Sequence, residues 1–386
     1  MRVIVVYIAD FLKAPPVLSV IKALDDLGYE IVVCTIGDKN SDYFINLGNV
    51  KNVVFEFVND NYKDESRIIS KFLRMFRIRK ALWNAIDKYY DENTLLWVVS
   101  EVSVKHLGKK LLRKRYLLHL LELIEDMYYI SGSSCPVFKL DRKAYVKNAK
   151  ALIECEYNRA HITKAWWDLN EIPFVLPNKP YVSIDIPKNS DITSSEKLRD
   201  LMEKLQDKKI VLYQGNISKE RPLDVFIEAV NELGDDWAFV MMLNGENPYT
   251  DLKSSNLYFV PFVAPPFHLE VTSHAYVGVL SYVPIKNSYS ILNTLYCAPN
   301  KIWEYSKYGV PMISNDLPAL KYLFDLKHIG VCVPRMNKEE IKEALLVIDN
   351  NHGYFSNESS NYYASLDYKS IVKDIADFSF RRSIDA

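Results

Sequence analysis

The segment "APNKIWEYSKYGVPMIS" (298–314) combines a cation and a carboxylate with the pattern of a short helix followed by a buried strand. Pro299 suits the first helical turn, where its missing N–H costs nothing. The free N–H groups of that turn and the positive end of the helix dipole attract an anion. Asn300 and Lys301 reinforce this attraction, and Glu304 shares a helix face with Asn300 because the two residues are four apart.

The spacing within this helix indicates a particular kind of ligand. Glu304 lies five residues after Pro299, which is roughly 7.5 Å along a helix axis. That is about the span from a diphosphate to the hydroxyls of the attached ribose. We therefore predict that Lys301 binds the phosphates and Glu304 the sugar hydroxyls of a nucleoside diphosphate. The alternative is an ordinary surface helix in which Glu304 pairs with Lys301 or Lys307.

Two further segments carry polar groups at the ends of expected strands. In "YQGNISKERP" a strand ends at Gly215, where a glycine lets backbone N–H groups approach a phosphate, and Lys219 or Arg221 supplies charge. Asn244 follows the next expected strand. Because ligands of open α/β sheets bind outside the carboxyl ends of the strands, we expect these groups to converge on one site.

The elements that must position these residues follow an alternating pattern. Apolar strand-like runs at 2–9 and 30–37 flank a helical pattern at 17–28, and a fresh unit of the same kind begins at 208–215. This rhythm predicts parallel strands joined by right-handed crossovers. The predicted fold class is α/β, with two doubly wound Rossmann-like domains facing a cleft. We predict a first domain at 1–180, a linker at 181–207, a second domain at 208–365 and a helix returning to the first domain at 366–386.

Composition excludes several classes of protein. The 386 residues are 49% hydrophobic and carry a net charge of −1, which argues against a globally basic nucleic-acid binder. The five cysteines are scattered and form no Cys-x-x-Cys pair, so a reducing cytoplasmic compartment is expected. The N-terminal segment lacks the pattern of a signal peptide, and no apolar run approaches the ~18 residues of a membrane span.

The second half resembles the donor domain of GT-B glycosyltransferases, and most resembles the retaining family 4 of bacterial surface-polysaccharide biosynthesis. The resemblance rests on "GNISKERPLDVFIEAV", "FVMMLNGE", "LYFVPFV" and "APNKIWEYSKYGVPMISNDLPAL". In that family an Arg and a Lys of the first loop hold the donor diphosphate; here Asn216 has the Arg position and Arg221 the Lys position. Of the family's two carboxylates separated by seven residues, Glu304 matches the second, which holds the ribose, whereas Tyr296 replaces the first.

The resemblance implies roles for further residues. Phe262 and Val263 match a loop that contacts the nucleobase in the family. In the first half, a strand ending in a polar pair faces the cleft in relatives, and here Glu122 and His119 of "YLLHLLEL" are its candidates for catalytic residues. A histidine in an apolar run can equally be a hydrogen-bonded core residue, and this alternative stays open.

The implied function is transfer of a sugar from a nucleotide sugar, with a UDP-sugar favoured, to a glycan acceptor that we expect to be lipid-linked. Arg221 and Lys301 would stabilise the leaving diphosphate as catalytic groups. No metal or other cofactor is expected, because the sequence contains no Asp-x-Asp motif. Retention of anomeric configuration follows from the family alone. A nucleotide-sugar epimerase and a catalytically silent partner subunit of the same fold remain alternatives.

Two basic runs, 66–80 and 105–115, are candidates for a membrane-binding surface. The first has six Lys and Arg residues and no acidic residue, with apolar residues interleaved. It is typical of an amphipathic helix on an anionic membrane surface. We therefore expect a cytoplasmic protein with peripheral membrane association. A surface helix that packs its apolar stripe on the domain is the alternative.

Overall fold

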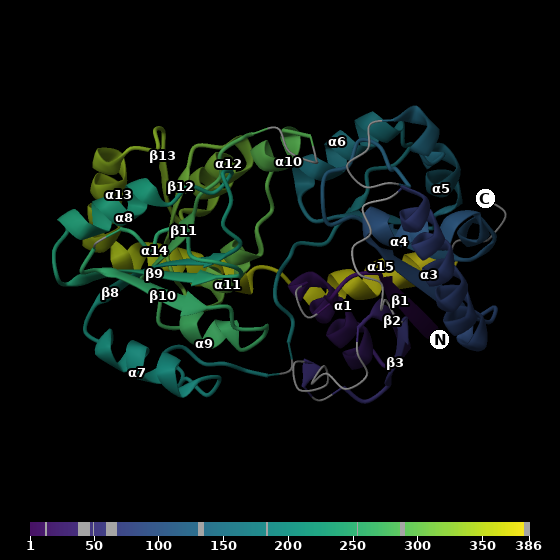
Figure 1. The fold of residues 1–386 in the computed structure, drawn as a ribbon, viewed down its shortest axis with the longest axis horizontal. Helices are drawn as coiled ribbons and strands as arrows, with labels where there is room; N and C mark the ends of the chain where they lie inside the picture. Colours follow the sequence, from purple (N-terminus) through teal and green to yellow (C-terminus); the bar gives the residue numbers. More distant parts are fainter. Residues whose placement is uncertain are drawn as a thin grey trace. The chain divides into compact units, whose positions relative to one another are not determined.

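The computed structural model describes residues 1–11, 14–37, 47–48, 50–58, 68–129, 135–182, 184–252, 254–285 and 290–381 (Figure 1). The chain forms two compact units. Unit 1 contains Met1–Ser183, Asn287–Asn293 and Tyr368–Ala386, and unit 2 contains Ile184–Lys286 and Thr294–Asp367.

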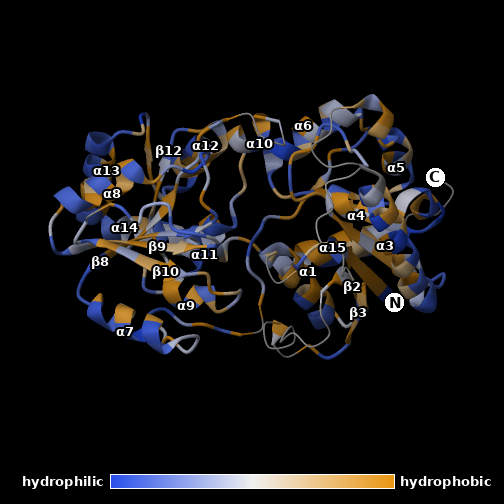
Figure 2. Cartoon of the chain, viewed as in Figure 1, coloured by the Kyte–Doolittle hydropathy of each residue, from blue (hydrophilic) through white to orange (hydrophobic). Residues whose placement is uncertain are grey.

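The described residues of unit 1 form a seven-stranded parallel sheet in the order β3-β2-β1-β4-β5-β6-β7. Its central strands are almost entirely apolar because helices cover both faces of a parallel sheet. All six residues of β4 are buried, for example, and the strands are correspondingly orange in Figure 2. The strands are β1 (Arg2–Tyr7), β2 (Glu30–Ile36), β3 (Val53–Val58), β4 (Thr94–Val99), β5 (Tyr116–His119), β6 (Leu152–Glu154) and β7 (Phe174–Val175).

The helices of unit 1 include the end of the chain. Helix α15 (Tyr368–Arg381) packs on α1 (Pro15–Asp26), and Val372 and Ile375 share one hydrophobic core with Leu18. The other helices of unit 1 are α3 (Ile68–Tyr89), α4 (Ser100–Leu107), α5 (Arg142–Asn148) and α6 (Tyr157–Trp167), with the 3-10 helices η2 (Gly108–Arg113) and η3 (Pro136–Phe138).

The described residues of unit 2 form a six-stranded parallel sheet in the order β10-β9-β8-β11-β12-β13. Its strands are β8 (Lys209–Gly215), β9 (Trp237–Leu243), β10 (Leu257–Pro261), β11 (Val277–Leu280), β12 (Met312–Asn315) and β13 (Gly330–Val333). Its helices are α7 (Glu196–Lys204), α8 (Asp224–Glu232), α9 (His268–Thr272), α11 (Asn300–Lys307), α12 (Pro318–Lys327), α13 (Lys338–Asn350) and α14 (His352–Ala364). The short α10 (Leu292–Leu295) begins in unit 1 and ends in unit 2.

These two parallel sheets confirm the predicted α/β class with two doubly wound domains. In each sheet the strand order reverses once, between β1 and β4 in unit 1 and between β8 and β11 in unit 2. Such reversal points are where open α/β sheets bind ligands.

The domain boundaries need two corrections. The predicted linker at 181–207 is wrong from Ile184 onward, because Ile186, Leu198 and Met202 are buried in the core of unit 2. The predicted second domain also contains a segment that belongs to unit 1, Asn287–Asn293, of which the structure describes residues 290–293. This segment is anchored to unit 1 by side-chain hydrogen bonds that are described below. No local sequence pattern predicts them.

No helix within the described part of the chain combines the length and apolar character needed to cross a membrane.

Candidate functional site

The loop after β8 lies next to a buried lysine of α11. Gly215, the last residue of β8, has φ +124°, a conformation that residues with a Cβ rarely adopt. A Cβ at Gly215 would stand 3.8 Å from Nζ of Lys301. Helix α11 begins at Asn300, with Pro299 as its N-cap. The structure therefore brings the carboxyl end of β8 and the first turn of α11 together.

Two tyrosines hold the cations of this site. Nζ of Lys301 lies 4.4 Å from the ring centroid of Tyr213 and 5.1 Å from that of Tyr282. Cζ of Arg221 lies 5.4 Å from the same Tyr282 ring. These are cation–π distances, so Tyr282 gathers both charges around one aromatic ring. The Arg221 Nη1–H donates to the carbonyl of Asn216 (3.3 Å), which also accepts from the Tyr213 hydroxyl (2.5 Å).

The cations at this place form no close ion pair with a carboxylate of the described residues, although Glu304 acts electrostatically on Lys301 and Glu220 on Arg221. Neither Lys301 nor Arg221 forms an ion pair with an acidic side chain among the residues that the structure describes, and the buried Nε of Arg221 has no hydrogen-bond partner there. Burial, assisted by the neighbouring Arg221, holds the pKa of Lys301 well below its usual value against the opposing influence of Glu304. Two cations this close repel each other, so an anion bound between them would be favourable.

Glu304 lies in a buried hydrogen-bond network behind these cations. Its Oε2 accepts from Nε2 of Gln214 (2.6 Å), and its Oε1 lies 3.1 Å from Nε2 of His268. Gln214 is fixed in turn, because its Oε1 accepts from the hydroxyl of Thr272 (2.7 Å). Although burial alone would raise the pKa of Glu304, His268 and Gln214 hold it below its usual value, so the carboxylate is ionised at neutral pH.

This network bears on the predicted ribose contact. The residue Glu304 is only 4% exposed, and each of its carboxylate oxygens already has a protein partner. A carboxylate oxygen can accept two hydrogen bonds, so a ribose hydroxyl can still be accommodated. The role of Glu304 toward a ribose stays a prediction.

The other predicted donor-site residues follow the strands β8, β9 and β10. The backbone N–H of Asn244, directly after β9, donates to the carbonyl of Gly215 (3.2 Å). Lys219 and Asn216 are exposed in the loop after β8. Phe262 (41% exposed) and Val263 follow β10, which β9 separates from β8. No described contact joins Phe262 or Val263 to the two cations.

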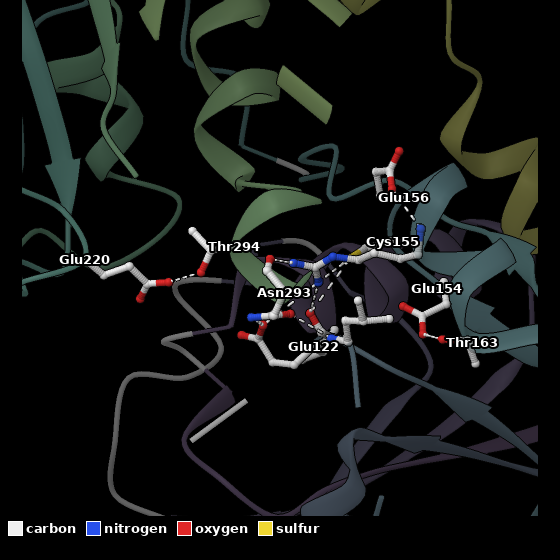
Figure 3. A network of polar contacts seen from close by, with 11 residues as sticks. Glu122, Glu154, Cys155, Glu156, Thr163, Glu220, Asn293 and Thr294 are labelled. Atoms are coloured by element: carbon white, nitrogen blue, oxygen red, sulfur yellow. Dashed lines mark hydrogen bonds and ion pairs between the residues drawn. The ribbon is translucent and has the colours of Figure 1, made fainter. Parts of the chain in front are cut away.

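In unit 1, Glu122 lies shortly after β5 and belongs to a polar network (Figure 3). Its Oε2 accepts from Nδ2 of Asn293 (2.8 Å) and lies 3.9 Å from Nη1 of Arg159. Asn293 is held on both sides: its Oδ1 accepts from the N–H of Leu123 (2.8 Å), and its carbonyl accepts from Arg159 Nη2 (2.9 Å). The side chain of Glu122 is 42% exposed, so it remains accessible on unit 1.

His119 is a core residue. It ends β5 with 1% exposure, and its Nδ1 accepts from the indole N–H of Trp97 (3.2 Å). Burial lowers the pKa of His119 to about 3, so the ring is neutral at physiological pH. The structure therefore favours the hydrogen-bonded core histidine over a catalytic role for His119, because a side chain this buried does not reach a substrate.

Comparison with known proteins rests on structure. No protein-family model and no curated protein matches the sequence. Solved structures do match over the whole chain. Trehalose-6-phosphate synthase OtsA has a TM-score of 0.64 and 11% identity, covering 99% of this chain and 100% of that one. Anabaena HepE in complex with UDP and glucose has a TM-score of 0.63 and 12% identity, covering 98% of each chain. The chain has the GT-B fold.

A third GT-B match is sucrose-phosphate synthase from Thermosynechococcus elongatus, with a TM-score of 0.59 and 13% identity, covering 99% of this chain and 97% of that one. At these identities the similarity concerns the fold. The activity must therefore be argued from the residues of this chain.

Proposed function

We propose that this protein is a glycosyltransferase that takes a sugar from a nucleotide-diphosphate sugar, with a UDP-sugar favoured, and transfers it to a glycan acceptor. The observation that carries the proposal is the pair of cations, Lys301 and Arg221, which converge where the sheet order of unit 2 reverses without an acidic partner among the described residues. A diphosphate is the anion that such a site suits. The HepE structure of the same fold holds UDP and glucose, which supports this choice.

In the proposed reaction the bond between the sugar and the diphosphate breaks, and negative charge develops on the leaving diphosphate. Lys301 and Arg221 stabilise this charge in a largely buried setting, where such a contribution is large. Glu304 receives the ribose hydroxyls, and the backbone around Phe262 and Val263 receives the base. The two cations supply the positive charge that a divalent metal supplies in other transferases, so the proposed reaction needs no metal. Retention at the anomeric carbon remains part of the family resemblance.

On the acceptor side we propose Glu122 as the catalytic residue that unit 1 contributes, and a lipid-linked glycan as the acceptor. Helix α3 supports peripheral membrane association. It exposes the large apolar side chains Leu73 (52%) and Phe76 (54%) next to the exposed cations Arg77 and Lys80. Ser66 and Arg67 of the predicted run 66–80 lie outside the described residues.

The second basic run, 105–115, contributes less to a membrane surface than its composition suggests. Lys110 forms an ion pair with Asp87, and Lys114 lies 3.9 Å from the same carboxylate. Lys110 and Lys114 also stack over Trp83 and Tyr90. The sequence interpretation missed this partial neutralisation, because Asp87 lies on α3, outside both basic runs.

A thermal-shift screen of nucleotide sugars, followed by an assay of nucleotide release with and without glycan acceptors, tests the proposal. A ligand that binds only the native state raises its melting temperature. We expect stabilisation by one class of nucleotide sugar and acceptor-dependent release of the nucleoside diphosphate. Sugar conversion without acceptor would indicate an epimerase instead. Absence of binding by every nucleotide and nucleotide sugar would reject the proposal in favour of a silent partner subunit.

A further inference from the structure

Unit 1 contains a cavity of about 290 Å³ at the carboxyl ends of its central strands. Its wall includes Ile8, directly after β1, Ile36 at the end of β2, and Val102 at the start of α4. Strands β1 and β4 are the neighbours at which the order of this sheet reverses. The cavity therefore occupies the position where open α/β sheets bind ligands, and nothing in the proposed donor site uses it.

Three cationic side chains line this cavity: Lys71 and Arg74 from α3, and Lys105 from α4. No acidic side chain is among its described lining residues. Burial, with a smaller effect of Arg74, lowers the pKa of Lys105 against the opposing influence of Glu101. An anion in the cavity would lie close to all three cations, so its binding would be electrostatically favourable.

The rest of the cavity wall is mostly apolar or uncharged. His106 is neutral at physiological pH, because burial lowers its pKa to about 4 and its Nδ1 is bonded to the carbonyl of Val102. The remaining lining side chains are Phe72, Met75, Ile78 and Tyr129. A ligand that uses the whole cavity must therefore be an anion attached to an apolar group.

Helices α3 and α4 are fixed to each other beneath these side chains. The guanidinium of Arg79 donates through Nε to the carbonyl of His106 (2.8 Å) and through Nη2 to that of Lys105 (2.7 Å). The indole N–H of Trp83 donates to the carbonyl of Leu107 (2.9 Å). The two helices that carry the cations are thus held in place before any ligand arrives, which lowers the entropic cost of binding.

We propose that this cavity binds the phosphate group of a single amphiphile, a phosphate or diphosphate ester of an apolar chain. Lys71, Arg74 and Lys105 contact the phosphate oxygens, and Met75, Ile78 and Val102 contact the first carbons of the chain. A volume of about 290 Å³ is at the small end of ligand pockets, so it holds the head group and the start of the chain. That this ligand is the sugar acceptor rests on the proposed function; that it binds here does not.

Calorimetry with octyl phosphate below its micelle-forming concentration tests the inference, with inorganic phosphate and octyl glucoside as separate probes. We expect saturable one-to-one binding of octyl phosphate and at least tenfold weaker binding of the other two probes. Arg74→Gln and Lys105→Met should each weaken octyl phosphate about tenfold, the effect of one charged hydrogen bond. Lys80→Gln removes the same charge from an exposed position of α3 outside the lining and should change the affinity less than twofold. Melting curves verify that each variant is folded.

If Lys105→Met does not fold, Arg74→Gln and the cavity-filling Val102→Phe carry the test, and both should weaken octyl phosphate binding. Equal affinity for octyl phosphate and inorganic phosphate would overturn the inference, as would equal losses in Arg74→Gln and Lys80→Gln. Attachment to phosphatidic acid vesicles with no binding of octyl phosphate would also overturn it, since this points to surface attraction alone. A protein that binds a nucleotide sugar but not octyl phosphate would reject this inference and leave the proposed function intact. A protein that binds octyl phosphate but no nucleotide sugar would reject only the proposed function.

Discussion

Lys301 is a buried cation that two tyrosine rings surround and that forms no close ion pair with a carboxylate among the described residues. In the absence of ligand such a charge is a stability cost, because burial removes the water that an ammonium group prefers. We expect the binding of an anion to offset this stability cost. The residue is therefore the place where stability and binding are coupled most directly.

This cost should appear as a pH dependence of stability. The pKa of Lys301 is lowered from 10.5 in the folded protein, so the unfolded chain binds more protons between the lowered value and 10.5. The free energy of unfolding should consequently rise with pH across that window. Without ligand, Lys301→Met should be more stable than the natural protein at pH 7 by about 1–3 kcal/mol, and the difference should shrink toward pH 10.

Urea denaturation at several pH values measures this difference. Lys307→Met, on the same helix, is the matched control, because Lys307 forms an ordinary pair with Asp185 (3.2 Å). A Lys301→Met protein that is less stable at pH 7, or a difference that does not vary with pH, would contradict the interpretation.

For His119 we predict that substitution lowers stability but leaves the rate of sugar transfer almost unchanged. His119→Phe leaves the indole N–H of Trp97 without its acceptor in the core, which should lower the free energy of unfolding by about 1–3 kcal/mol. The rate of sugar transfer in the folded enzyme should stay within about twofold of the natural rate. Glu122→Gln is the comparison, since it should lower the rate with little loss of stability. A large rate loss in folded His119→Phe would restore His119 as a catalytic residue.

At the scale of residues, sequence reasoning found those whose type and local spacing carry the chemistry. Gly215, Lys301 and Arg221 could be selected because each stands next to the end of a strand or the start of a helix, and the structure brings them together. Gln214 and His268 were missed. Their hydrogen bonds to Glu304 span 90 and 36 residues, so only the fold reveals them.

At the scale of elements, strands of unit 2 such as β9, with the sequence WAFVMML, could be predicted because they are apolar runs between turn residues. Helices α12, α13 and α14 were not predicted. Strand β3 of unit 1 was missed because it is only partly buried and contains Glu56, whereas β4 was missed although its sequence TLLWVV is an apolar run. The place of residues 290–293 in unit 1 depends on hydrogen bonds of Asn293 to Glu122, Leu123 and Arg159. Such long-range contacts produce no periodic pattern in the sequence, so they cannot be predicted from it.

The junction between α3 and α4 can be tested through its glycine. A Cβ at Gly108 would lie 2.7 Å from Cζ of Arg79, whereas a Cβ at Gly28 would meet nothing within 4 Å; both glycines have positive φ. Each change to alanine costs about 1–2 kcal/mol of backbone strain. Gly108→Ala should cost about 1–3 kcal/mol more than Gly28→Ala, because the guanidinium loses its two carbonyl partners.

Denaturation midpoints of the two variants give this difference. In an Arg79→Met background the extra cost of Gly108→Ala should vanish, because there is no guanidinium left to displace. Equal costs of Gly108→Ala and Gly28→Ala in the natural background would show that Arg79 does not fix the junction.

At the scale of the whole molecule, the exposed side of α3 should mediate association with anionic membranes. Arg77→Gln combined with Lys80→Gln removes two cations beside the exposed Leu73 and Phe76. Recovery with vesicles containing anionic lipid should fall about tenfold in a flotation assay, since each cation near such a surface contributes to attraction. Neutral vesicles should recover little protein in any case.

The matched control removes two exposed cations from α7 in unit 2, Lys197→Gln and Lys204→Gln, with the same change in net charge. This control should float like the natural protein. Equal losses in both double variants would mean that only net charge matters and that α3 is not a membrane-binding surface.

The central claim is that a diphosphate binds between Lys301 and Arg221. Calorimetric titration of the natural protein with UDP and with uridine tests it most directly, because the two ligands differ only in the phosphates. We predict that UDP binds at least about a hundredfold more tightly than uridine and that Lys301→Met reduces this ratio about tenfold or more, while Lys307→Met leaves it unchanged. Equal affinities for UDP and uridine, or a ratio that Lys301→Met does not alter, would contradict it.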